Sequence, residues 1–208
     1  MQFGVGDIHG CFDKFKVLLE CEIKITKNHE IICVGDVVTK GNKNLELLEY
    51  IIWLNKNGYN VKSVIGSHEY RMLSLYYSDF GMLELYLEKY NCKDLLLGEV
   101  NVIMDLLSSF PFYIETNEWI IAHSYFSINM SSQIDIRNML GLSNFSGLSN
   151  HSIRSKNQLF GHRAITLEEL ANSIKSKSKY INIDTGCVYE DYGFLTSINL
   201  NTMDIISI

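Results

Sequence analysis

The chain has 208 residues, of which 47% are hydrophobic and 20% are charged, as in ordinary globular domains. This length fits one domain, because single domains usually hold roughly 50 to 250 residues. The formal charge of -6 argues against a broad basic surface, so we expect no stable binding of nucleic acid. Phosphate substrates stay open, because bound divalent cations can reverse the field inside a cleft.

Cysteine usage and hydropathy favour a cytoplasmic protein. The five cysteines are odd in number and include no CxxC pair, so we expect reduced thiols rather than disulfides or a zinc ribbon. The first strand is predicted close to the N-terminus, without the basic region of a signal peptide. No apolar run approaches the roughly 20 residues that cross a bilayer, so we expect no membrane association.

Strands and helices are predicted to alternate in the first third of the chain. Short β-branched or apolar runs bounded by polar residues predict strands at 2–6, 31–34 and 61–65. Apolar residues at helical spacing predict helices at 12–21, 44–54 and 68–77. Gly58 is a typical stop signal after the second of these helices.

The middle of the chain is predicted to be helical, and its end to consist mainly of strands. Leu, Met, Tyr and Glu at helical spacing predict a helical insertion at about 78–110 within a single domain of 1–208. Residues 112–115 and 119–122 predict a hairpin, and the Ser- and Asn-rich stretch 127–157 predicts a loop with one short helix. A helix is predicted at 167–174, and further strands at 158–160, 180–184, 193–199 and 204–208. This order predicts an α/β fold with a mixed sheet or two sheets.

Acidic and imidazole side chains follow the predicted strands, mostly next to glycine. They are Asp7, His9, Asp36, His68, His123 and His162. Ligands bind at strand ends in α/β sheets, so we expect these side chains to converge. Asp7 and His9 point to the same side of an extended chain and could share one metal. Asp36 could bridge to a second metal, held also by His123 and His162; such a donor set suits Mn, Fe, Zn or Co better than Mg or Ca.

Each of these places has an ordinary structural explanation when it is taken alone. A Gly-Asp pair such as 35–36 is typical of a turn, and residues 67–69 could simply cap a helix. A lone histidine after a strand is more often an ordinary side chain than a ligand. His29 and His151 lie in polar segments without this context and receive no role. The joint pattern is what favours a metal site.

Five motifs in order carry a resemblance to a known family. They are DIHG at 7–10, GDVVTKG at 35–41, GSHE at 66–69, His123 in IIAHS, and GHR at 161–163. This set resembles the calcineurin-like metallophosphoesterases, and within them the bacteriophage and bacterial serine/threonine protein phosphatases and the diadenosine tetraphosphate hydrolases. The resemblance covers nearly the whole chain and implies a sandwich of two mixed β-sheets flanked by helices.

The resemblance also implies a dinuclear centre that hydrolyses a phosphate ester or anhydride. One divalent metal would be held by Asp7, His9 and Asp36. The second would be held by Asp36, Ser67, His123 and His162. Manganese is the first expectation, with Fe, Zn, Co or Ni as alternatives. His68 matches the family's general acid, and Lys40, with Arg71 and Arg163, would neutralise phosphate; for Arg71 the alternative is an ordinary solvated helix position. The substrate would be a phosphorylated protein or a nucleotide.

Three residues depart from the family pattern. Ser67 stands where the family has a metal-binding Asn, and its shorter hydroxyl should weaken the second metal. Thr39 replaces the Asp that orients the catalytic histidine, and Lys40 replaces an Arg that binds phosphate bidentately. The alternative to an active enzyme is therefore an impaired metal- or phosphate-binding protein. Specificity is expected from 70–110 and 124–157. Tyrosines of the first segment could stack bases, although core packing is the commoner use of aromatic residues at helical spacing.

Overall fold

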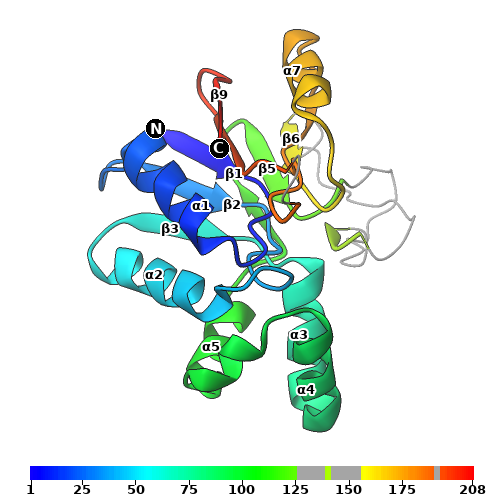
Figure 1. The fold of residues 1–208 in the computed structure, drawn as a ribbon. Helices are drawn as coiled ribbons and strands as arrows, with labels where there is room; N and C mark the ends of the chain where they lie inside the picture. Colours follow the sequence, from blue (N-terminus) through cyan, green and yellow to red (C-terminus); the bar gives the residue numbers. More distant parts are fainter. Residues whose placement is uncertain (126–138, 142–155, 190–192) are drawn as a thin grey trace.

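Two mixed β-sheets form the centre of the molecule (Figure 1). The computed structural model describes residues 1–125, 139–141, 156–189 and 193–208. The first sheet has the order β3-β2-β1-β8-β9, with bounds Asn60–Ser63, Glu30–Cys33, Gln2–Val5, Thr196–Asn199 and Ile205–Ser207. The second has the order β4-β5-β6-β7, with bounds Tyr113–Glu115, Trp119–Ala122, Asn157–Phe160 and Tyr180–Asn182. The predicted α/β sandwich of two mixed sheets is confirmed.

The parallel pairs bring the carboxyl ends of several strands to one edge of each sheet. β1 runs parallel to β2, and β2 runs parallel to β3. In the second sheet β5, β6 and β7 are parallel, whereas β4 pairs with β5 in the predicted hairpin. Loops that leave these ends are free of the ladder, so side chains from distant parts of the sequence can meet there.

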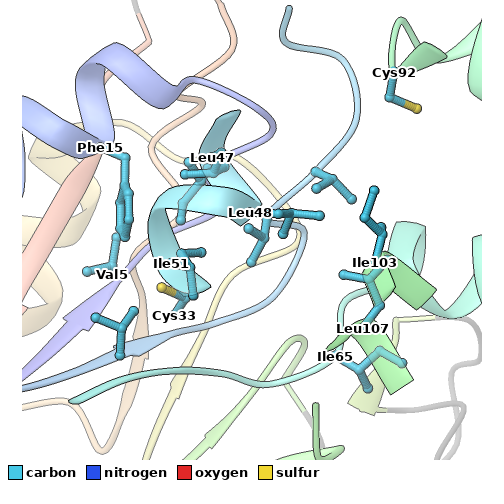
Figure 2. Close-up of a cluster of buried hydrophobic side chains, with 14 of the residues drawn as sticks. Val5, Phe15, Cys33, Leu47, Leu48, Ile51, Ile65, Cys92, Ile103 and Leu107 are labelled. Carbon is cyan, nitrogen blue, oxygen red and sulfur yellow. The ribbon is translucent and has the colours of Figure 1, made fainter. Parts of the chain in front are cut away.

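Helices cover the outer face of the first sheet. α1 (Phe12–Val17) continues into the π-helix η1 (Leu18–Ile23), and α2 (Asn44–Lys56) lies beside them. Figure 2 shows Phe15 of α1 and Leu47 of α2 near Val5 of β1 within the larger buried cluster. α2 stops where predicted, because Gly58 has a φ of +84° that other residues rarely adopt.

A helical segment follows the first three strands. It contains α3 (Ser67–Ser78), α4 (Phe80–Lys89), the 3-10 helix η2 (Lys93–Leu97) and α5 (Val100–Ser108). The helical spacing predicted for this part of the chain is therefore confirmed. α3 packs against both α4 and α5 and begins at the end of β3, so the segment lies directly beside the strand ends.

The space between the sheets is filled by a second apolar cluster. Along β2 the side chains alternate: Ile31 and Cys33 belong to the helix-covered core, whereas Ile32 and the following Val34 face the second sheet. Leu170 of α7 (Leu167–Lys175) belongs to this second cluster. Both faces of the central strands are thus buried, which explains their short continuous apolar runs.

Two strands are shorter than predicted, and one predicted segment lies outside the described residues. β7 and β8 are shorter than predicted: β7 ends at Asn182 and β8 begins at Thr196, and a β-bridge joins Gly186 to Phe194 between them. The expected loop and short helix at 127–157 fall almost wholly on residues outside the described ranges. Among the described residues, no helix combines the length and the apolar character that crossing a bilayer requires.

Candidate metal centre

Five predicted ligands meet at the strand ends. Asp7 and His9 follow β1, Asp36 follows β2, His123 follows β5 and His162 follows β6. Ligand atoms of Asp7, His9 and Asp36 all lie within 4.8 Å of one another, and so do those of Asp36, His123 and His162. The two triads share Asp36, as a carboxylate between two cations would require. The expected convergence of these side chains is found.

Short distances connect the imidazoles and the shared carboxylate. Asp36 Oδ2 lies 3.9 Å from His9 Nε2 and 3.4 Å from His123 Nε2, and His123 Nε2 lies 3.1 Å from His162 Nδ1. The other ring nitrogen of His123 is 3.0 Å from the carbonyl oxygen of Val34. A hydrogen on that nitrogen would donate to the carbonyl, so Nε2 is left to face the cluster as a ligand atom.

Charge burial makes the cluster suitable for cations. Burial and then the charge of Asp184 raise the pKa of Asp7 well above its ordinary value. Burial alone would lower the pKa of His123, but the Asp36 carboxylate and its hydrogen bond raise it to about 10. Several carboxylates buried together repel each other, and divalent cations would relieve this repulsion in place of a proton. Mixed carboxylate and imidazole donors fit a first-row transition metal.

Backbone strain is concentrated at the same place. Among non-glycine residues with positive φ, His9 (50°), Asp36 (45°), Thr39 (81°), Lys40 (62°) and His162 (77°) all belong to or border the cluster. Such conformations cost of order 1–3 kcal/mol each and persist only where the surroundings enforce them. Thr39 is the most unusual of these, since its β-branched side chain disfavours the left-handed region. Strain of this kind is typical of active sites and ligand clamps, which fits a functional role for this edge of the sheets.

Glycine at 161 allows Asp7 to approach the loop that carries His162. A Cβ on Gly161 would lie 1.9 Å from Asp7 Oδ1. The backbone N–H of His162 donates to both oxygens of Asp7, at 3.3 and 3.2 Å. The ends of β1 and β6, on different sheets, are therefore joined through one carboxylate.

Glu69 connects the two loops that carry Asp36 and Ser67. It is fully buried and accepts hydrogen bonds from the backbone N–H groups of Asp36, Val38 and Gly66, at 3.0, 3.1 and 2.8 Å. Burial and then the charge of Asp36 raise the pKa of Glu69 to about 7. Through these hydrogen bonds its carboxylate holds the two loops together.

Ser67 and His68 approach Asp36 from the start of α3. The Ser67 hydroxyl donates to both oxygens of Asp36, each at 3.3 Å, and the His68 backbone N–H donates to Asp36 Oδ1 at 2.9 Å. The positive end of the helix dipole thus faces the shared carboxylate. Lys40 Nζ lies 3.0 Å from His9 Nε2, so its ammonium borders the cluster.

The two arginines are placed differently. Arg71 lines a cavity of about 370 Å³ beside the cluster. The cavity is lined by Ser67, His68, Tyr70, Arg71, Ser74, Tyr86 and Tyr90. Arg163 is exposed and follows His162 in the chain. The pKa of His162 is lowered to about 4 by burial, by the charge of His123 and by the charge of Arg163. Neither guanidinium is among the groups that approach Asp36.

Sequence reasoning did not assign two residues that the structure places at the site. Asp184 is buried, and its charge raises the pKa of Asp7. It follows an apolar strand and precedes a glycine by two residues, so the strand-end rule that selected the other carboxylates could have found it. Tyr86 lies with its hydroxyl 2.6 Å from His68 Nδ1, and nothing local in the sequence indicates this contact.

The fold and the cluster define a class: an α/β sandwich with side chains that could hold metal ions gathered at the strand ends. The sequence model of the calcineurin-like phosphoesterases matches residues 3–145, and the chain belongs to this family. A solved structure of a protein proposed to be a diadenosine tetraphosphatase has the same fold, with a TM-score of 0.68 and 20% identity, over 100% of this chain and 92% of that one.

Two bacterial relatives extend the comparison. The symmetrical bis(5'-nucleosyl)-tetraphosphatase of Vibrio parahaemolyticus is 30% identical over 125 residues, which are 58% of this chain and 42% of that one. The protein of the same name from Buchnera aphidicola is 39% identical over 75 residues, which are 36% of this chain and 26% of that one. The chain therefore matches less than half the length of these curated relatives.

Proposed function

We propose that the protein hydrolyses a phosphate ester or anhydride with two divalent metal ions. The first metal would be held by Asp7, His9 and Asp36. The second would be held by Asp36, Ser67, His123 and His162. The observation that carries this proposal is the pair of donor triads that share one buried carboxylate.

The metals would be manganese in the first instance, with Fe, Zn, Co or Ni as alternatives that the same donors accept. When bound, two such ions supply Lewis acidity and activate a water for in-line attack on phosphorus. The residues around them would do the rest. His68 would give a proton to the leaving oxygen, and Lys40 would neutralise charge on the phosphate.

A dinucleoside polyphosphate is the substrate class that we propose first. The relatives named above act on such compounds by their names. In addition, the cavity beside His68 has tyrosines on its walls and one arginine, which suit a base and a phosphate. A phosphoprotein is the second possibility to be tested with the same protein. The five cysteines are free thiols, which supports a reducing compartment, and we propose the cytoplasm.

The alternative of an impaired metal- or phosphate-binding protein rests on Thr39, Lys40 and Ser67. The complete donor triads argue for activity, because loss of one weak ligand need not empty a site. Ser67 still directs its hydroxyl at Asp36. We therefore favour the enzyme.

The test is turnover by the manganese-loaded protein. Diadenosine tetraphosphate, bis-p-nitrophenyl phosphate, p-nitrophenyl phosphate and a phosphoserine peptide would be compared. Asp36→Asn should abolish turnover, whereas Asp105→Asn, the same change on the exposed face of α5, should not alter it. Two bound metals without turnover of any substrate would refute hydrolysis and support the impaired protein instead.

A further inference from the structure

The ring of His68 is held by a tyrosine from the helical segment. Tyr86 of α4 places its hydroxyl 2.6 Å from His68 Nδ1. Tyr90, one helical turn later, makes a T-shaped contact with the imidazole, with ring centroids 4.9 Å apart and an interplanar angle of 77°. The two tyrosine rings lie 4.5 Å apart on the same face of the helix, as positions i and i+4 do. His68 is therefore fixed by a hydrogen bond and by an aromatic contact.

Thr39, at the position that orients this histidine in the family pattern, contacts His9 instead. Thr39 stands where the family pattern has a carboxylate for that purpose, but its hydroxyl lies 3.4 Å from His9 Nδ1. Its backbone N–H donates to the side chain of Asn44 at 2.7 Å. Thr39 is thus engaged with His9, and within the described part of the chain it makes no hydrogen bond to His68. The hydrogen-bond partner of His68 Nδ1 is the Tyr86 hydroxyl.

We propose that Tyr86 is a positioning residue for His68, in the place of the missing carboxylate. This proposal rests on the proposed hydrolysis, in which His68 is the proton donor. In imidazolium both ring nitrogens carry hydrogen, and the Tyr86 oxygen accepts from Nδ1–H. The hydrogen on Nε2 is then the one available to the reaction.

The proton balance follows from that arrangement. As the bond from phosphorus to the leaving oxygen breaks, its electron pair stays on that oxygen, which takes the proton from Nε2. The imidazole becomes neutral and keeps its Nδ1–H on Tyr86. A neutral phenol orients the ring without adding negative charge, so its contribution lies in geometry. Tyr86 also lines the cavity beside His68, so a leaving group bound in that cavity would lie next to the proton that it needs.

The dependence of rate on the leaving group tests this role. A good leaving group such as p-nitrophenolate departs without a proton, whereas phenolate needs one. With manganese bound, Tyr86→Phe should lower kcat for phenyl phosphate roughly 10–100-fold, part of the roughly 10²–10⁴-fold that general acids supply. Phenylalanine keeps the aromatic ring on the cavity wall, so KM for both substrates should stay nearly unchanged. The kcat for p-nitrophenyl phosphate, whose leaving group needs no proton, should fall by no more than about threefold.

Tyr76→Phe is a matched control. The Tyr76 hydroxyl also makes a 2.6 Å hydrogen bond, to Asn101, away from the cluster, so its loss should change neither rate. In a His68→Ala background, Tyr86→Phe should have no further effect, since it acts through that histidine. NMR of the metal-free protein gives a readout apart from activity: the imidazole Nδ1–H of His68 should be protected from exchange, and the protection should be lost in Tyr86→Phe.

The outcomes separate the two proposals. An inactive wild-type protein that retains the protected Nδ1–H would refute the hydrolysis, and with it the role of Tyr86 in it, although the positioning contact would stand. If the wild type is active and Tyr86→Phe lowers kcat equally for phenyl phosphate and p-nitrophenyl phosphate, only the positioning role would be refuted. The same holds if KM changes or if the effect persists without His68.

Discussion

A methyl group at position 161 should remove one metal and spare the other. Gly161→Ala places a Cβ 1.9 Å from Asp7 Oδ1 and 2.8 Å from Val34 Cγ2. Since carbon and oxygen in contact need roughly 3.2 Å, the carboxylate must move by about 1.3 Å. Metal-ligand distances tolerate only about 0.2 Å, so the displaced Asp7 can no longer serve with His9 and Asp36. The second triad contains no Asp7 and should keep its ion.

The expected result is a change in stoichiometry as well as affinity. Altering even an outer partner of a metal ligand typically costs 10–100-fold in affinity, so displacement of a ligand should cost about 100-fold or more at one site. Calorimetric titration with Mn²⁺ should show about two ions per wild-type chain and one tight ion in Gly161→Ala. Thermal unfolding of the metal-free variant measures whether the fold is intact.

Gly81→Ala is the matched control for this experiment. Gly81 lies in α4, where a Cβ would make only an ordinary contact of 3.5 Å with Asp79. Alanine in a helix is favoured over glycine by roughly 0.5–1 kcal/mol, so this variant should be slightly more stable and bind two ions. Two tight ions with unchanged affinity in a folded Gly161→Ala protein would refute the placement of Asp7 in the first site.

Three further changes probe other parts of the structure. Glu69→Ala leaves three buried backbone N–H groups without an acceptor, so it should lower the free energy of unfolding, measured by urea denaturation, by roughly 2–5 kcal/mol. The control Glu84→Ala changes an exposed residue and should cost less than about 0.5 kcal/mol. Equal losses in the two variants would contradict the role given to Glu69. Burial would raise the pKa of Glu30, but three side-chain hydrogen bonds leave it below its ordinary value. A carboxyl whose pKa is lower in the folded than in the unfolded state stabilises the protein at pH values above the unfolded pKa of about 4.5. The free energy of unfolding of the wild type should therefore fall more steeply between pH 5 and pH 3 than that of Glu30→Gln. Parallel curves of unfolding free energy against pH would contradict the role given to Glu30. Ser67→Asn should raise Mn²⁺ affinity roughly tenfold, because an amide oxygen reaches beyond the present contact with Asp36; lower affinity in a folded variant would show that position 67 is not a ligand.

The strands and the strand-end carboxylates could be predicted because their signals are local. The run from Ile31 to Val34 is apolar on both faces, and the structure buries one face under helices and the other under the second sheet. Asp7 and Asp36 follow such runs directly, and parallel strands bring their ends to one edge. The same rule selects Asp184, which follows the apolar strand β7 and is buried beside Asp7.

The sequence by itself determined which side chains gather at this edge, because strand periodicity and the positions just beyond strands are properties of neighbouring residues. Only the tertiary structure decided what holds them. Tyr86 has the spacing of an ordinary helical core residue, and it meets His68 because α4 packs back on α3, 18 positions along the chain. Glu69 could have been a simple helix-start acid, yet it bonds three N–H groups from two loops. Such contacts depend on how separate elements pack together, and packing is a property of the whole fold rather than of any short stretch of it.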